Sequence, residues 1–277
     1  MILYTNIFFC LSRIELLYLG LMKLAVITGA AQGIGRRTAE VFAAAGYSLA
    51  LLDLQPCTAT MESVRPTGCD TAEFTGDLSD ELVVEATAAA IGERWNRVDV
   101  LVNNAGISSI APAETIDART FRRVLEVNLV APFLLARSFG KQMLAQHSGC
   151  VVNVASIAGL FGVADRAAYN ASKHGLIGLT RTLAAEWGGR GVRCNAVCPG
   201  WVKTEMDAAD QANGTYTDED IIGVNPMGRF ASPDDIARAI LFLADPAQSG
   251  FVNGHALVVD GGWTVDASWQ SLRLSHR

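Results

Sequence analysis

TGAAQGIG, at residues 28–35, stands between an apolar run at 24–28 and an amphipathic stretch at 34–45. Glycines let the backbone turn tightly here and approach a pyrophosphate, while the first turn of a helix offers it free N–H groups. Taken alone, such a turn is a weak signal. Because it joins the first strand to the first helix of an alternating chain, it predicts a dinucleotide-binding loop formed by Gly29, Gln32, Gly33, Ile34 and Gly35.

The rest of the chain alternates short β-rich runs with longer amphipathic stretches, which is typical of a parallel sheet built from strand–helix–strand units. The expected strands are almost continuously apolar, so we expect helices on both faces of the sheet. The sequence therefore predicts an α/β fold with one doubly wound, Rossmann-like parallel sheet. Its predicted strands are 24–28, 48–52, 72–75, 98–102, 150–154, 192–197 and 256–259, and its predicted helices are 34–45, 80–94, 118–146, 167–187 and 233–243.

The chain shows no internal repeat and no linker, so residues 22–277 are predicted to form a single domain, the one that carries the dinucleotide-binding loop. One segment, 203–229, is polar and poorly periodic, with a turn signal at Asn213-Gly214 and a breaker at Pro226. Irregular insertions of this length tend to be lids or binding loops. We expect this segment to be a mobile flap over the site.

Residues 1–21 lack the basic start, the cleavage site and the long apolar run of a signal peptide or a membrane span. A second methionine, Met22, directly precedes the first expected strand. We therefore expect an N-terminal extension that is disordered or reflects a misassigned start. An anchor lying in a membrane interface is the alternative.

The amino-acid composition and the net charge exclude several classes of protein. The 277 residues are 50% hydrophobic and 18% charged, which excludes a disordered protein. A net charge of −6 argues against nucleic acid and against an anionic membrane surface. The six cysteines have no CxxC spacing, and the four histidines form no ligand set, so we expect no metal site and a cytoplasmic location.

Asp53 ends the second expected strand, 18 residues after Gly35, where a carboxylate can accept hydrogen bonds from a ribose diol and repel a 2′-phosphate. A plain surface carboxylate is the alternative. Gln32 and Leu54 are neutral, and Arg36 and Arg37 are expected to be solvated positions on the first helix. The sequence therefore predicts NAD in preference to NADP.

Asp77-Leu78 follows the third expected strand, where the adenine of a dinucleotide would lie. A carboxylate there can accept a hydrogen bond from the exocyclic amine. N-capping of the 80–94 helix is an equally good explanation.

Further motifs follow in the same chain, namely NNAG at 103–106, Asn128, Ser156, YNASK at 169–173, Pro199-Gly200 and Thr204. In this order and spacing, from Leu24 to about Gly262, the chain resembles the short-chain dehydrogenase/reductases. The resemblance implies a three-layer fold with strand order 3-2-1-4-5-6-7, and assembly as a homotetramer.

Tyr169 and Lys173 lie four residues apart on an expected helix, so both side chains project from one face. A free tyrosine, with a pKa of about 10, is a poor base at neutral pH. A nearby ammonium and a nicotinamide cation favour the phenolate and bring it toward general acid/base range. Ser156, just past a strand end, can donate a hydrogen bond to a substrate oxygen. A packed tyrosine and a solvated lysine are the structural alternative.

The resemblance adds roles to these residues. Asn128 is expected to hold a water that links Lys173 to solvent, and Lys173 to bind the nicotinamide ribose. Hydride is expected to move on the pro-S side of the nicotinamide. The further cofactor contacts expected are Asn104, Ala105, Gly106, Pro199, Gly200, Val202 and Thr204.

The predicted function is NAD-dependent interconversion of a secondary alcohol, or sugar hemiacetal, and its carbonyl. A small polyol, sugar or hydroxy acid is the expected substrate, contacted by Ser156, Phe161, Tyr169 and Trp201. A 3-oxoacyl thioester reductase and a non-catalytic dinucleotide sensor are the alternatives. The tail at 261–277 is expected to pack at a subunit interface, or to bring Trp269, Arg273 and Arg277 to a neighbour's pocket.

Overall fold

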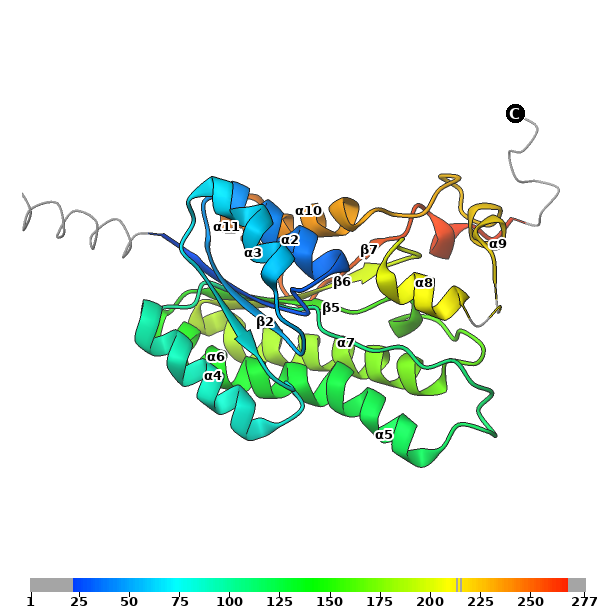
Figure 1. Ribbon diagram of the computed structural model, residues 1–277, viewed down its shortest axis with the longest axis horizontal. Helices are drawn as coiled ribbons and strands as arrows, with labels where there is room; N and C mark the ends of the chain where they lie inside the picture. Colours follow the sequence, from blue (N-terminus) through cyan, green and yellow to red (C-terminus); the bar gives the residue numbers. More distant parts are fainter. Residues whose placement is uncertain (1–21, 213, 215, 269–277) are drawn as a thin grey trace, which may run out of the picture.

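Seven parallel strands form one sheet in the computed structural model, in the order β3-β2-β1-β4-β5-β6-β7 (Figure 1). The structure describes residues 22–268 except 213 and 215, so the predicted extension at 1–21 lies outside the described residues. The observed strand order and the doubly wound sheet confirm the predicted fold class. The strands are β1 Leu24–Thr28, β2 Ser48–Asp53, β3 Thr71–Thr75, β4 Val100–Asn103, β5 Gly149–Val154, β6 Val192–Pro199 and β7 Ala256–Val259.

Helices cover both faces of the sheet (Figure 1). One face carries α2 Gly33–Ala44, α3 Thr58–Val64, α10 Pro233–Ala244 and α11 Pro246–Ser249. The other face carries α4 Glu81–Trp95, α5 Ala118–Leu125, α6 Ala131–Gln146 and α7 Ala167–Trp187. In the described part of the chain, no helix is both long enough and apolar enough to cross a membrane.

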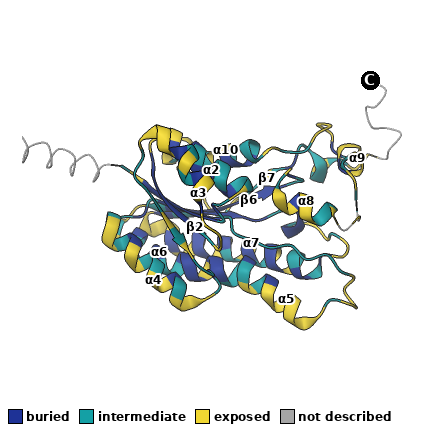
Figure 2. Ribbon diagram, viewed as in Figure 1, coloured by how far each residue is buried: buried dark blue, intermediate teal, exposed yellow. Residues whose placement is uncertain are grey.

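Strand β1 explains why the predicted strands are apolar at every position. Ala25 and Ile27 pack into the core on the α2 and α10 side, while Leu24 and Val26 pack into the core on the α4, α6 and α7 side. Successive side chains of a strand point to opposite faces, so both registers must be apolar when both faces are covered. Figure 2 shows the buried strands between helices whose outward faces are exposed.

The predicted helix at 118–146 is wrong in one respect, because a π-helical turn at Glu126–Val130 separates α5 from α6. Single π-turns of this kind occur often at functional sites. This one places Asn128 on the inside of the molecule, where its side chain is fully buried. The short helices α3 and α11 were not predicted at all.

The segment 203–229 is more regular than its weak periodicity predicted. It contains α8 Glu205–Gln211 and α9 Asp218–Ile222, two helices too short to show an apolar stripe. Their N-caps were readable in the sequence, since Thr204 accepts a hydrogen bond from the Asp207 backbone and Thr217 forms a capping box with Asp220.

The carboxyl ends of the strands meet at one edge of the sheet. The chain runs from β1 outward to β3 and then returns to β4 on the other side of β1. This reversal leaves a crevice at the ends of β1 and β4, the place where open α/β sheets bind ligands. The fold therefore brings the glycine loop, Asp53 and Ser156 to the same edge.

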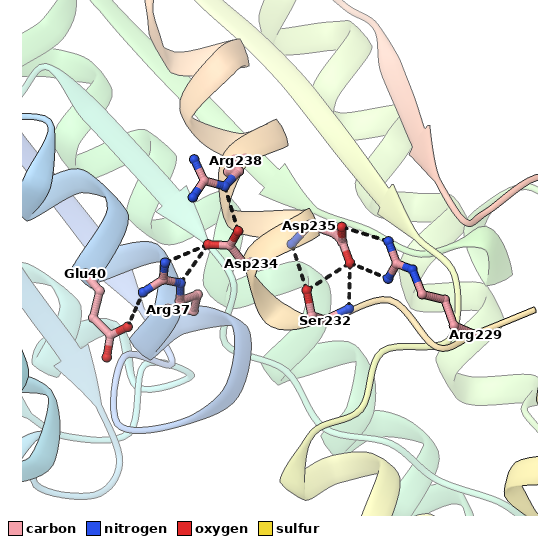
Figure 3. Close-up of polar contacts among 7 residues, drawn as sticks. All are labelled: Arg37, Glu40, Arg229, Ser232, Asp234, Asp235 and Arg238. Carbon is pink, nitrogen blue, oxygen red and sulfur yellow. Dashed lines mark hydrogen bonds and ion pairs between the residues drawn. The ribbon is translucent and has the colours of Figure 1, made fainter. Parts of the chain in front are cut away.

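Helix α10 begins with a capping box that ties the end of the segment 203–229 to the helices on its face of the sheet. Ser232 accepts a hydrogen bond from the Asp235 backbone, and its own backbone donates to Asp235 Oδ2 at 2.8 Å. The Asp235 carboxylate also pairs with Arg229 at 2.7 Å, as Figure 3 shows. The Arg229 guanidinium holds the pKa of Asp235 below its usual range.

Replacing Ser232 with alanine should lower the free energy of unfolding by about 1 kcal/mol, because the first turn of α10 loses its cap. Ser148→Ala is the matched control, since the exposed Ser148 hydroxyl makes no hydrogen bond among the described residues. Urea unfolding of both variants measures the difference. Equal midpoints for the two variants would mean that the cap contributes nothing to stability.

Candidate active site

A cavity of about 460 Å³ opens at the carboxyl edge of the sheet. Segments from the glycine loop, from the ends of β2 to β6 and from α8 line it. The predicted site residues found in its lining are Gly29, Gln32, Gly33, Ile34, Asp53, Asp77, Leu78, Asn104, Ala105, Gly106, Ser156, Tyr169, Lys173, Pro199, Gly200, Trp201, Val202 and Thr204.

Three predicted residues lie elsewhere. Gly35 packs behind the glycine loop, and Asn128 is buried beneath the cavity wall. Phe161, predicted to contact substrate, is 45% exposed and is absent from the cavity lining. Trp269, Arg273 and Arg277 of the predicted tail lie outside the described residues.

The glycine loop is shaped so that only glycine fits at two points. Gly29 has a φ of +64°, and a Cβ there would lie 2.8 Å from the Asn104 side-chain nitrogen. A Cβ on Gly35 would lie 1.9 Å from the Gly29 carbonyl oxygen. Asn104 Nδ2 donates to the carbonyl oxygens of Thr28 and Gly29 and joins this loop to the end of β4. The result is a backbone surface that a pyrophosphate can approach closely at the start of α2.

Asp53 is held in place by the backbone on either side of it. Its Oδ2 accepts from the Ala31 N–H at 2.9 Å and its Oδ1 from the Gln55 N–H at 3.0 Å. The fixed carboxylate faces the cavity beside Leu54, which is 58% exposed. This arrangement, together with the glycine loop, fits the ribose and pyrophosphate of a dinucleotide.

The arginines of α2 are partly exposed, with 43% of the Arg36 and 38% of the Arg37 side chain accessible, and Arg37 is also paired. Arg37 pairs with Glu40 and with Asp234 of α10, both at 2.7 Å (Figure 3). Arg36 also lies near Glu40, at 3.4 Å. Because carboxylates occupy the Arg37 guanidinium, that side chain is already neutralised on the surface between two helices.

Asp77 lines the cavity and is not the cap of α4. The N-cap is Asp80, whose side chain accepts from the Leu82 N–H. Asp77 instead accepts from Ser79 and pairs with Arg123 at 2.8 Å. The capping alternative is therefore wrong, and the Asp77 carboxylate stays at the predicted adenine side.

Ser156, Tyr169 and Lys173 converge where α7 passes the end of β5. Lys173 Nζ donates to the Val154 carbonyl oxygen at 2.8 Å and lies 5.5 Å from the centre of the Tyr169 ring. Tyr169 and Ser156 both line the cavity beside it. A substrate oxygen can therefore contact a hydroxyl donor and a phenol together.

Burial shifts the pKa values of Lys173 and Tyr169. Desolvation lowers the pKa of Lys173 to about 8, so its amine loses its proton more readily than an exposed lysine. Burial also raises the pKa of Tyr169, while the Ser156 hydroxyl and the Arg166 guanidinium act to lower it.

Asn128 sits in the π-helical turn with its side chain fully engaged. Its Oδ1 accepts from the Ile107 N–H at 2.9 Å, and its Nδ2 donates to the Ile107 carbonyl and to Ser172 Oγ. The amide thus fixes the loop after β4 against α7, close to Lys173. Its position beside the lysine fits the predicted relay, although the side chain itself is occupied by these partners.

The strand-end segment after β6 forms the opposite wall. Gly200 packs against Asp260, where a Cβ would lie 2.8 Å from the Asp260 Cβ. Val202 bridges to Ala231, and Thr204 caps α8. The backbone at the end of β6 is therefore held in place before the chain enters α8.

Sequence reasoning placed Ser108 and part of 205–225 near the substrate but missed Arg166, around which a polar cluster forms at this end of the cavity. Arg166 Nη2 pairs with Asp210 Oδ2 at 3.0 Å, and Arg166 Nη1 donates to Ser108 Oγ at 2.7 Å. Tyr216 lies beside Trp201, with ring centroids 5.1 Å apart. The available signal was the position of Arg166, one helical turn before Tyr169. Among the described residues, no group of three potential metal ligands comes together.

Gly35→Ala should weaken dinucleotide binding more than tenfold, because the new methyl group must displace the Gly29 carbonyl from the loop. Gly92→Ala is the matched control, since a Cβ at Gly92 in α4 meets nothing within 4 Å. Calorimetric titration with NAD measures both, and circular dichroism checks the fold. Wild-type affinity in a folded Gly35→Ala protein would contradict the assignment of the loop.

A family model described as enoyl-(acyl carrier protein) reductase matches residues 29–264. D-threitol dehydrogenase of Mycolicibacterium smegmatis is 40% identical over 247 residues, covering 88% of this chain and 93% of that protein. Galactitol 2-dehydrogenase (L-tagatose-forming) of Cereibacter sphaeroides is 40% identical over 245 residues, with coverages of 87% and 94%.

Among solved structures, a proposed NAD(P)-dependent gluconate 5-dehydrogenase from Beutenbergia cavernae, with NADP bound at low occupancy, superposes with a TM-score of 0.84. It is 40% identical, and the match covers 90% of this chain and 99% of that one. The chain is an oxidoreductase acting on CH–OH groups, with a fold that binds a nicotinamide dinucleotide. It belongs to the short-chain dehydrogenase/reductase family.

Proposed function

We propose that the protein oxidises a secondary alcohol of a small polyol or sugar, or of a hydroxy acid, reversibly and with NAD. The observation that carries this proposal is the convergence of Ser156, Tyr169 and Lys173 on one side of a cavity whose other end fits a dinucleotide. The bound nicotinamide supplies the acceptor for the hydride that leaves the carbinol carbon.

The protein's own residues orient the substrate and transfer its hydroxyl proton. The Ser156 hydroxyl donates a hydrogen bond to the substrate oxygen, and Tyr169 takes the proton from the alcohol or returns it to the carbonyl. Lys173 lies next to Tyr169, where its positive charge favours the phenolate. Asn128 orders the backbone behind Lys173. We propose that the proton passes from Tyr169 through Lys173 and a water held by Asn128 to solvent.

A preference for NAD over NADP rests on charge. The Asp53 carboxylate faces the cavity where an adenine ribose would lie, and it repels a 2′-phosphate. The adjacent Leu54 offers no cation, and Arg37 is held by Glu40 and Asp234. The NADP-bound gluconate 5-dehydrogenase shows that the same fold accepts the phosphorylated cofactor, so the preference belongs to these side chains.

The relatives support a polyol or sugar. Two of them are named for threitol and galactitol, and the structural relative is named for gluconate. Aromatic side chains at Trp201 and Tyr216 form a wall against which the carbon chain of such a substrate can pack. We also propose a single catalytic domain with 203–229 as its substrate flap, assembly as a homotetramer and a cytoplasmic location.

Two other functions would require different cofactors or fewer of the site residues. A 3-oxoacyl thioester reductase would use NADPH, against which Asp53 argues. A non-catalytic dinucleotide sensor would bind NAD without needing Asn128, Ser156, Tyr169 and Lys173 together.

The test follows NADH absorbance with NAD or NADP over a panel of polyols, aldoses, hydroxy acids and acyl thioesters. Turnover with NAD on at least one polyol or sugar is expected, together with a loss of at least about 1,000-fold in kcat for Tyr169→Phe, because the proton acceptor is removed. Phe161→Leu is the control for an aromatic change outside the cavity lining. Full activity in Tyr169→Phe, or tight NAD binding without turnover of any substrate, would contradict the proposal.

A further inference from the structure

Arg166 is a buried cation of the cavity that neither takes nor gives a proton in the proposed reaction. It directly precedes α7, and its side chain is 10% exposed. Its guanidinium carbon lies 6.0 Å from the centre of the Tyr169 ring and 5.7 Å from that of Trp201. It therefore stands within reach of substrate groups next to the reacting carbon.

Asp210 neutralises this guanidinium. Arg166 Nη1 and Nη2 both donate to Asp210 Oδ2 at 3.0 Å, and Nη1 also donates to Ser108 Oγ. A guanidinium carries five N–H donors, and residues in the described part of the chain accept from three of them. Since Asp210 belongs to α8, the pair also joins the start of α7 to the flap.

The other charges around the cavity leave no surplus cation for a substrate carboxylate, if Lys173 is set aside for the reaction. Among the described lining residues, Arg123 pairs with Asp77 at 2.8 Å. Asp207, which is also buried in the lining, lies 3.2 Å from Lys203. An anionic substrate would therefore place its carboxylate among acidic side chains, and burying such a charge without a partner is costly.

Resting on the proposed dehydrogenase function, we propose that Arg166 and Asp210 form a neutral recognition pair that selects an uncharged polyol or open-chain sugar over a hydroxy acid. Hydroxyl groups both donate and accept hydrogen bonds, so vicinal hydroxyls match a guanidinium beside a carboxylate. A carboxylate only accepts, and Asp210 repels it. Asp210 is thus a specificity-determining residue that keeps the charge of Arg166 from attracting acids.

The experiment measures a selectivity ratio, defined as kcat/KM for galactitol divided by kcat/KM for galactonate, and repeats it with threitol and threonate. Asp210→Asn removes the negative charge and keeps the shape of the side chain. We expect this variant to lower the ratio at least about tenfold, because the Arg166 charge becomes available to the acid. Arg166→Gln should move the ratio in the opposite direction.

Asp218→Asn is the matched control. It removes a carboxylate from the same flap, where Asp218 pairs with Lys203 and makes no contact with Arg166. Its ratio should equal that of the wild type. If Asp210→Asn instead lowers kcat/KM for both substrates by the same factor, Asp210 only holds α8 in place, and the recognition pair is wrong. A wild-type protein that prefers galactonate would overturn it as well.

Binding separates this proposal from the proposed function. Calorimetry in the presence of NAD should show tighter galactonate binding to Asp210→Asn than to the wild type, whether or not turnover occurs. A wild type that turns over no member of the alcohol panel, combined with this gain in binding, would contradict the dehydrogenase proposal and support the recognition pair. Unchanged galactonate binding in both Asp210→Asn and Arg166→Gln would overturn the recognition pair.

Discussion

The hydrogen bond from Lys173 Nζ to the Val154 carbonyl oxygen, 2.8 Å long and buried, holds the candidate active site together. It fastens helix α7 to the end of β5. Ser156 follows Val154 by two residues, and Tyr169 precedes Lys173 by about one helical turn, so the same bond sets the distance between the hydroxyl donor and the phenol. An amine buried without a partner would be costly, and the strand carbonyl supplies one.

The second constraint is the close approach of backbone at the glycine loop. Gly35 allows α2 to start against the carbonyl of Gly29, and Asn104 binds that same carbonyl from the end of β4. This contact joins the loop after β1 to the end of β4, where a pyrophosphate can approach the backbone. The dinucleotide end and the reacting end of the cavity are therefore positioned by neighbouring strands of one rigid sheet.

Much of this arrangement could be predicted from local sequence. Strands buried on both faces appear as apolar runs, as β1 does. The loop at 28–35 and the Tyr169–Lys173 spacing can be recognised from neighbouring residues alone. The π-helical turn at Asn128 could not be predicted, because the residues around it favour an ordinary helix. Its geometry depends on the amide's bonds to Ile107 and Ser172, which are distant in sequence.

The pair of Arg166 and Asp210 shows the same limit, since 44 residues separate the partners and only the fold brings α8 over the start of α7. The helices of the flap were missed for another reason. Thr204 and Thr217 were readable caps, but two turns or fewer of helix leave no periodic stripe. Specificity thus depends on the least predictable part of the chain, while the reaction depends on the most predictable part.

The most direct test of the central claim traces the hydrogen itself. The protein is mixed with NAD and a polyol that carries deuterium on its carbinol carbons, and the NADH formed is examined by proton NMR. We expect one deuterium at the pro-S position of C4. Unlabelled NADH, or deuterium at the pro-R position, would contradict it.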